Sequence, residues 1–347
     1  MAGPGVARAP GTGASVLDAI GRTPLVELSR VTSGLDGRVL AKLEYLNPGG
    51  SKKDRIALRM VEDAEADGTL RPGQTVVELT SGNTGTGLAI VCAVKGYPFV
   101  AIMSAGNSTE RAQMMRALGA EVILVEQHEG SLDGHVTGDD LALVEAVASA
   151  VASERNAFRA DQFHLSGNPA AHADGTGAEL WEQAGGDVSA FCEFVGTGGT
   201  FAGISRFLKA KRPAISCYII EPAGAAVLAG QPLVDPAHRI QGGGYSMTTL
   251  PLIDPALIDG HLVVSDVDAI DGARRLARQE GIIAGFSAGA CLVAAEQLLR
   301  GRHAGQTIAI VLADSGMKYL STDLWGDTSF DRLLSGHDAR AADVPDD

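Results

Sequence analysis

Residue types that mark several common protein classes are scarce in this chain of 347 residues. Aromatic residues make up only 5%, and the cysteines are limited to Cys92, Cys192, Cys217 and Cys291. They lie far apart in apolar surroundings, which favours buried, reduced thiols over disulfide bonds or a zinc site. The histidines form no HxxxH pair. We therefore expect no metal site.

Positive charge and long apolar runs are also scarce. The formal net charge is -14, which repels nucleic acid and anionic membranes, so we expect neither as a partner. No apolar run approaches the roughly 20 residues that span a bilayer. Residues 1–13 lack the continuous apolar segment of a signal peptide. These absences predict a cytoplasmic protein with a disordered leader over residues 1–13 and a flexible acidic tail over residues 331–347.

Short apolar runs that alternate with helical patterns are abundant. The predicted strands cover residues 38–43, 75–79, 99–103, 121–125, 191–195, 217–221, 261–264 and 307–313. The predicted helices cover residues 54–66, 86–95, 109–118, 140–154, 171–183, 201–211, 268–280 and 288–299. Apolar strands that alternate with helices predict an α/β fold whose parallel sheets are covered on both faces. The length of the chain suggests two domains.

Adjacent lysines, Lys52 and Lys53, stand in the first turn of the predicted helix 54–66. Ser51 and Asp54 have the spacing of a capping box for this helix. The helix dipole disfavours cations here, so at least one lysine should have another reason to be present. The same dipole lowers the pKa of an amine, which suits a lysine that forms an imine with a carbonyl compound. An exposed lysine pair is the alternative, and this loop alone does not decide between them.

Two further turns, residues 80–85 and residues 196–200, are rich in glycine and hydroxyl groups and precede predicted helices. Free backbone N–H groups at a helix N-terminus bind a carboxylate or a phosphate. An ordinary glycine-rich turn with capping hydroxyls is the alternative for each. Phe201 stands where a GxGxxG dinucleotide motif needs glycine, and GxxxxGK[ST] does not occur, so neither nucleotide motif is supported.

Polar residues also end the predicted strand 307–313, where Asp314 and Ser315 follow its last residue. Parallel sheets bind ligands at this end of their strands. Residues 285–289 (Gly-Phe-Ser-Ala-Gly) form a similar turn that could simply cap the next helix. Together these turns supply a lysine, a carboxylate-type turn and a phosphate-type turn. A phosphorylated aldehyde cofactor that reacts with an amino acid needs this set.

Motifs spread over about residues 20–325 resemble the fold-type II pyridoxal-phosphate enzymes of the cysteine synthase and cystathionine β-synthase family. They occur in the family's order. They are Gly-Arg-Thr-Pro-Leu-Val at residues 21–26, Ser51-x-Lys53-Asp54-Arg55, the 80–85 turn, Gln162-Phe163, the 196–200 turn, Ile240-Gln241-Gly242 and Tyr319-Leu320-Ser321-Thr322.

The resemblance implies pyridoxal 5'-phosphate as cofactor, with Lys53 as the residue that carries it and later removes the α-proton of the substrate. It places Asn83 beside the cofactor's 3′ oxygen. It assigns the cofactor's phosphate to Gly196, Thr197, Gly198, Gly199 and Thr200. It assigns the substrate to Thr80, Ser81, Thr84, Gln162 and Gly242. For the pyridine nitrogen it favours the hydroxyl of Ser315, with Asp314 as the competing residue.

The implied reaction is β-replacement on L-serine, O-acetylserine or O-phosphoserine by sulfide, a thiol or an amine, through an aminoacrylate intermediate. A β-eliminating lyase or deaminase and a specialised synthase of a non-proteinogenic amino acid are alternatives. A catalytically silent binding partner is a third. Leu79 and Ser104 depart from the prolines that are usual in the family, and they leave the substrate open.

The implied architecture is a pair of three-layer parallel-sheet domains, as in the tryptophan synthase β-subunit. We expect a large cofactor-binding domain over residues 14–49 plus 163–330. A small mobile domain over residues 50–162 should bind the substrate. The family also implies a homodimer.

Overall fold

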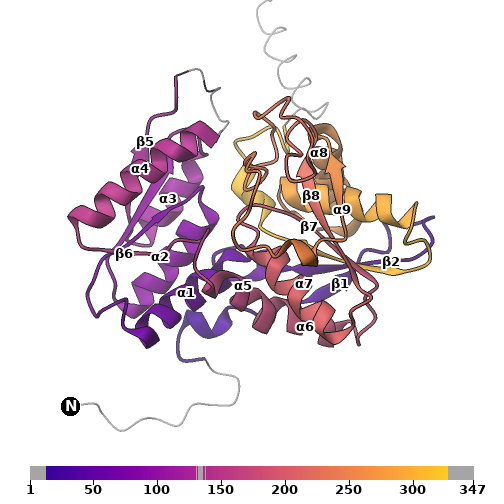
Figure 1. Ribbon diagram of the computed structural model, residues 1–347, viewed down its shortest axis with the longest axis horizontal. Helices are drawn as coiled ribbons and strands as arrows, with labels where there is room; N and C mark the ends of the chain where they lie inside the picture. Colours follow the sequence, from indigo (N-terminus) through magenta and orange to yellow (C-terminus); the bar gives the residue numbers. More distant parts are fainter. Residues whose placement is uncertain (1–12, 130, 132–135, 137, 327–347) are drawn as a thin grey trace, which may run out of the picture.

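The computed structural model describes residues 13–326, except 130, 132–135 and 137. It contains a six-stranded and a four-stranded sheet, each packed between helices (Figure 1). The prediction of an α/β fold with parallel, doubly covered sheets is confirmed. Within the described ranges, no helix is long and apolar enough to cross a membrane.

The larger sheet has the strand order β1-β2-β10-β7-β8-β9. Its strands are β1 (Leu25–Glu27), β2 (Arg38–Leu43), β7 (Ala190–Phe194), β8 (Ser216–Pro222), β9 (Gly260–Val264) and β10 (Thr307–Leu312). Every neighbouring pair is parallel except β1 and β2. Along β10, Ile308 and Ile310 pack towards α8 (Asp266–Arg275) and α9 (Phe286–Leu299). The alternate residues, Ala309 and Val311, pack towards α6 (Ala178–Gln183) and α7 (Gly199–Lys211).

The smaller sheet is parallel throughout, in the order β5-β4-β3-β6. Its strands are β3 (Val76–Leu79), β4 (Phe99–Ser104), β5 (Glu121–Val125) and β6 (Phe158–Arg159). One face packs on α1 (Lys53–Asp67), α2 (Asn83–Lys95) and α3 (Thr109–Ala117). The other face packs on α4 (Gly138–Glu154). Alternating burial of apolar side chains on both faces produces three layers here as well.

The sheets take their strands from separate parts of the chain. Residues 25–43 and 190–312 supply the larger sheet, and residues 76–159 supply the smaller one. The exact domain boundaries stay predictions. The predicted tail, residues 331–347, and residues 1–12 of the predicted leader lie outside the described residues.

Some elements differ from the sequence-based expectation. The predicted helix 171–183 is instead α5 (Gly167–Ala171), a π-helical turn (His172–Gly177) and α6. The predicted helix 268–280 likewise becomes α8 and a π-helical turn (Leu276–Glu280). The short strands β1 and β6 are absent from the prediction because two or three residues carry no readable periodicity.

The predicted capping box of α1 is wrong. Lys52 is the N-cap residue, and the Ser51 hydroxyl accepts a hydrogen bond from the Lys53 N–H at 3.2 Å. The Asp54 carboxylate accepts from the Gly49 N–H at 2.5 Å, not from the backbone of Ser51. Gly50, with a φ of 70°, turns the chain back on itself, so the carboxylate meets the amide of the preceding turn.

Candidate active site

Lys53 lies at the start of α1, where the ends of the two sheets meet. The preceding residues pair with the end of β10: the Lys52 N–H donates to the Ala313 carbonyl at 2.8 Å. Burial lowers the pKa of Lys53 to about 7, helped by the charge of Lys52 and opposed by that of Glu193. At neutral pH a large fraction of this amine is therefore uncharged and nucleophilic.

Lys52 has a different partner and a different role. Its ammonium forms a buried ion pair with Glu193 on β7, and the two side chains are 10% and 2% exposed. The alternative of an exposed lysine pair is therefore wrong. Because the Lys52 ammonium is paired with Glu193, the amine of Lys53, whose pKa is about 7, is the better candidate for chemistry.

The 80–85 turn brings hydroxyl and amide groups to the same place as Lys53. The Thr80 hydroxyl accepts from the N–H groups of Gly82 and Gly85, both at 2.9 Å, and so fixes the turn. The Thr84 hydroxyl donates to Gln162 at 2.6 Å. A cavity here is lined by all four side chains predicted to bind the substrate carboxylate, together with Lys53: Thr80, Ser81, Thr84 and Gln162. Asn83 and Gly242 also line it.

The 196–200 turn faces Lys53 from the larger sheet. Gly198 has a φ of 85° and precedes the first turn of α7, so the amides that follow it point out of the helix end. Asn168 donates to the Thr197 hydroxyl at 3.0 Å and to the Gln162 carbonyl at 2.7 Å. This amide therefore links the phosphate-type turn to the carboxylate-type site. A second cavity is lined by Lys53 and four residues of the turn: Gly196, Thr197, Gly198 and Thr200.

Asp314 is the centre of a buried hydrogen-bond network at the end of β10. Its carboxylate accepts from Asn83 at 2.7 Å and from the Tyr319 hydroxyl at 2.6 Å. Lys318 donates to the Asn83 side chain at 2.7 Å and to the Gly49 carbonyl at 2.8 Å. Burial lowers the pKa of Lys318 to about 8. Asn83, predicted to lie beside the cofactor ring, is thus oriented from both sides.

The hydroxyl for the pyridine nitrogen has more candidates than the sequence suggests. Ser315 accepts from the Met317 N–H at 3.3 Å and caps the turn Gly316–Tyr319. Gly285 is the N-cap residue of α9, so the turn at residues 285–289 does begin this helix, although no side chain caps it. Ser287 lies half-buried in the first turn of α9. The Gly285 N–H donates to the Asp314 carbonyl at 3.1 Å, which places this turn beside Asp314.

These residues fit a phosphorylated aldehyde. Gly199 has no room for a larger side chain, since a Cβ there would lie 2.0 Å from the Asn168 side-chain oxygen. Gly196 is also crowded, because a Cβ at that position would lie 2.7 Å from the Gly242 carbonyl oxygen. Such glycines let a backbone approach a phosphate closely. Lys53 and the 196–200 turn would hold the aldehyde carbon and the phosphate respectively.

Sequence reasoning misses several residues of the cleft. Glu193 and Lys318 are buried charged groups that carry no signal of their own in the sequence. Tyr319 begins the motif at residues 319–322, but the sequence does not predict its contact with Asp314. Arg111 on α3 is only 2% exposed and donates to the Ser81 carbonyl at 2.6 Å. From the sequence alone, Arg111 cannot be told apart from an ordinary charged residue on the surface of a helix, because it belongs to no recognisable motif.

The structure groups no cysteines or histidines into a candidate metal site within the described ranges. Cys92, Cys192, Cys217 and Cys291 are all free and buried. Across the described ranges, no group of three or more histidine, cysteine, aspartate or glutamate side chains could hold a metal ion.

Comparisons with known proteins agree with this geometry. Residues 16–314 match the model of the family described as pyridoxal-phosphate dependent enzymes. The chain is 41% identical over 312 residues to cysteine synthase 3 of Caenorhabditis elegans, covering 89% of each chain. It is 40% identical over 326 residues to O-ureido-L-serine synthase of Streptomyces lavendulae, covering 93% of this chain and 94% of that one.

A solved structure shows the same fold. The O-acetyl serine sulfhydrylase isoform 3 of Entamoeba histolytica superposes with a TM-score of 0.82 at 34% identity, over 96% of this chain and 99% of that one. The family match spans most of the chain, and the lysine and the glycine-rich turn lie together in the cleft. The chain therefore belongs to the family of pyridoxal-phosphate dependent enzymes.

Proposed function

We propose that the protein catalyses β-replacement on L-serine or an O-activated serine, exchanging the β-oxygen substituent for an incoming nucleophile. One observation carries this proposal: the low-pKa amine of Lys53 shares a cavity with the carboxylate-type turn. The named relatives support it, because cysteine and O-ureido-L-serine both have a serine-derived skeleton with a new β-substituent.

The 80–85 turn binds the substrate carboxylate. Its free amides lie at the N-terminus of α2, which begins at Asn83, and the helix dipole favours an anion there. Thr84 and Gln162 are already hydrogen-bonded to each other, so their side chains are oriented before the substrate arrives. The carboxylate in turn fixes the substrate's Cα relative to the neighbouring amine of Lys53.

Lys53 moves the α-proton. Bound pyridoxal phosphate supplies the electron sink that makes this proton acidic. A pKa of about 7 leaves the released amine of Lys53 largely neutral, and therefore able to accept the proton from Cα at physiological pH. Residues of both turns line the cavities around Lys53 and would limit the access of water to the reacting carbons.

The group that contacts the pyridine nitrogen is a hydroxyl in this proposal. One oxygen of Asp314, Oδ2, is held by Asn83 and Tyr319, while Oδ1 is buried without a hydrogen-bond partner among the described residues. We assign the role to a serine because these two hydrogen bonds tie the carboxylate to the Asn83 side. Ser315 remains the predicted residue, and Ser287 is its competitor at the same junction. A hydroxyl leaves the ring nitrogen neutral and favours elimination of the β-substituent. The homodimer and the cytoplasmic location also stay predictions.

A product assay with the purified holoenzyme tests the proposed function. O-acetylserine, O-phosphoserine and L-serine are each incubated with and without sulfide, and products are identified by mass spectrometry. Cysteine formation that requires sulfide supports β-replacement. Pyruvate and ammonia formed equally without a nucleophile would show the eliminating lyase instead. No turnover of any of the three would contradict the proposal.

A further inference from the structure

The cleft extends beyond the residues that hold the cofactor and the amino acid. The innermost cavity, at the 196–200 turn, shares Lys53, Thr197 and Gly242 with the cavity at the 80–85 turn. That second cavity shares Ser81, Arg111, Gly242 and Tyr245 with a third one, which we call the outer chamber. The outer chamber therefore opens directly onto the place where the β-carbon of the substrate should lie.

The outer chamber is larger than a sulfide ion requires. Its volume is about 430 Å³. Sulfide is comparable in size to water, whose share of liquid volume is about 30 Å³. Volumes of roughly 300–1,000 Å³ are typical of pockets for organic ligands. The size therefore suits a substrate with a further functional group, on either the leaving group or the nucleophile.

Arg111 brings a positive charge to this chamber, and no carboxylate among the described residues forms an ion pair with it. Its side chain is almost fully buried, with 2% exposure, and one nitrogen donates to the Ser81 carbonyl. Its Nε and Nη2 atoms are buried and have no hydrogen-bond partner among the described residues. Burying N–H groups of a guanidinium without acceptors is costly, so a ligand acceptor is expected there.

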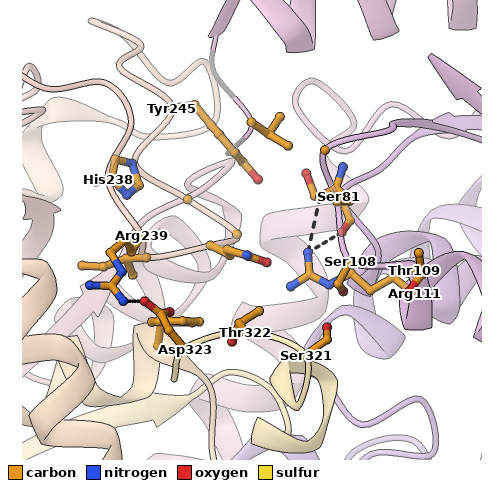
Figure 2. A pocket seen from close by; sticks show the side chains of 18 of the residues that line it. Ser81, Ser108, Thr109, Arg111, His238, Arg239, Tyr245, Ser321, Thr322 and Asp323 are labelled. Atoms are coloured by element: carbon orange, nitrogen blue, oxygen red, sulfur yellow. Dashed lines mark hydrogen bonds and ion pairs between the residues drawn. The ribbon is translucent and has the colours of Figure 1, made fainter. Parts of the chain in front are cut away.

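The other charges in the chamber do not neutralise Arg111. Arg239 and Asp323 form an ion pair with each other. Figure 2 shows this pair on one wall and Arg111, beside Ser81 and Ser108, on the opposite wall. The Arg111 guanidinium carbon lies 5.0 Å from the centroid of the Tyr319 ring, a cation–π contact that stabilises the charge but leaves its Nε and Nη2 without hydrogen-bond acceptors among the described residues. The lining thus has an excess of positive charge next to Arg111.

Two neutral polar groups also line the chamber. The Ser108 hydroxyl and the side-chain oxygen of Gln241 are buried without a hydrogen bond among the described residues. Ser108 immediately precedes α3, so its hydroxyl lies on the same wall as Arg111. Together they form a polar surface that could hold several oxygen atoms of one anionic group.

We propose that the outer chamber binds an anionic group of a substrate, a carboxylate or a phosphate, through the free N–H groups of Arg111. The inference rests on the proposed function and specifies the substrate class for the same site. The group is either a carboxylate on the incoming nucleophile or the phosphate of O-phosphoserine. Both present oxygen atoms that match the fork of a guanidinium.

Paired substrates in holoenzyme assays separate these sources. Mercaptoacetate and mercaptoethanol, each with O-acetylserine, compare a charged with a neutral nucleophile of similar size. O-phosphoserine and O-acetylserine, each with sulfide, compare the leaving groups. For each pair, kcat/KM for the anionic substrate is divided by kcat/KM for the neutral one, and this ratio is measured in the wild type, Arg111→Gln and Arg116→Gln. Arg116 is the control because it lies on the same helix and is exposed.

Arg111→Gln should lower one of the two ratios at least about tenfold. The substrate pair whose ratio changes identifies the source of the anion. Arg116→Gln should change neither ratio. A merely structural role of Arg111 would slow both members of each pair alike. As a readout without turnover, binding of inorganic phosphate to the holoenzyme, measured by calorimetry, should weaken by a similar factor in Arg111→Gln only.

Unchanged ratios together with unchanged phosphate binding would overturn the proposal. If Arg111→Gln does not fold, Arg111→Lys keeps the charge but loses the fork, and it should still lower one ratio at least about threefold. An unaltered Arg111→Lys enzyme would likewise overturn it. If the wild type forms no β-substituted product, the proposed function fails, and phosphate calorimetry still tests Arg111 independently.

Discussion

At the scale of single residues, the adjacent lysines Lys52 and Lys53 have different surroundings and therefore different charge states. Lys52 and Glu193 form a buried ion pair that lies beside Lys53. The positive charge of Lys52 disfavours a second positive charge nearby, and Glu193 offsets only part of that effect. The pair therefore contributes to keeping the amine of Lys53 uncharged, in addition to the larger effect of burial.

Replacing this pair should shift the pH dependence of cofactor capture. In the wild type, the neutral fraction of Lys53 rises with pH through its pKa of about 7, so the rate at which the apo-protein attaches pyridoxal phosphate should rise through the same region. The double variant Lys52→Met, Glu193→Gln removes the positive charge that most disfavours a charged Lys53. The pKa of Lys53 then increases, and the midpoint of the rate profile moves to higher pH.

The measurement is the rate of visible absorbance change after mixing apo-protein with cofactor across a pH series. The partly exposed pair of Lys209 and Asp259 offers a matched control, as Lys209→Met, Asp259→Asn removes the same charges from residues that do not line the cleft. A midpoint that stays in place or moves to lower pH in the Lys52 and Glu193 variant would refute this role of the pair.

Not every residue of the site can be found in the sequence. Lys53 stands out because a cation in the first turn of a helix is unfavourable and therefore needs a reason. Arg111 does not stand out, because a charge on a helix is ordinary until the fold buries it. The sequence suggests a helix cap at residues 285–289, and Gly285 is the N-cap residue of α9, but the sequence does not reveal that no side chain takes part in this cap.

At the scale of elements, the 196–200 turn depends on the close approach of α5 and α7. Asn168 in α5 contacts Gly199 and holds both Thr197 and the backbone of Gln162. The absence of a side chain at Gly199 is what allows this arrangement. The turn is thus positioned by its neighbouring helix, in addition to its own glycines.

Gly199→Ala should displace Asn168 and weaken cofactor binding roughly tenfold or more, through the lost hydrogen bonds. The added methyl group should also lower the free energy of unfolding by about 1–3 kcal/mol. Equilibrium dialysis measures the first effect and urea unfolding of the apo-protein the second. Arg206→Ala, on the exposed face of α7, should change neither. Wild-type cofactor affinity in Gly199→Ala would disprove the coupling.

The sequence predicts most elements because their apolar periodicity is long and regular. The helices 171–183 and 268–280 contain π-helical turns that this periodicity cannot reveal, because segments of 6 and 5 residues are too short to show a period of their own. The capping box is a wrong prediction for a similar reason. Its spacing is correct, but the tight turn at Gly50 brings Asp54 to another N–H group.

At the scale of the whole molecule, one ion cluster joins the elements of both sheets. Arg55 on α1 forms a bidentate contact with Glu44, at 2.7 and 2.8 Å, and another with Glu179 on α6, at 2.7 and 2.8 Å. Lys42 on β2 completes the cluster at 2.8 Å from Glu179. Burial alone would raise the pKa of Glu179, but hydrogen bonds from Arg55 and Lys42 lower it to about 2.

Arg55→Met should destabilise the protein by about 3–5 kcal/mol, because the buried carboxylate of Glu44 loses its cationic partner and keeps only the hydrogen bonds from Thr23 and Asn47. Arg59→Met, one turn along the same helix, removes half-exposed ion pairs and should cost less than about 1 kcal/mol. Urea unfolding of the two variants compares these free energies. Equal losses in both would show that the cluster does not hold the two halves together.

The overall architecture is predictable because the family motifs span nearly the whole chain. The partition of strands between two sheets follows from their order and their apolar character. The outer chamber is not predictable, since it combines α3, residues 238–245 and residues 321–323, which carry no common pattern. Its shape depends on packing between segments far apart in the sequence.

The identity of the cofactor-carrying lysine tests the central claim most directly. The holoenzyme is reduced with borohydride, digested and sequenced by mass spectrometry. We predict that the phosphopyridoxyl group is found on Lys53, and that Lys53→Ala loses both covalent attachment and turnover. A label on Lys52 or another lysine, or a Lys53→Ala variant that still attaches the cofactor and turns over, would contradict the account.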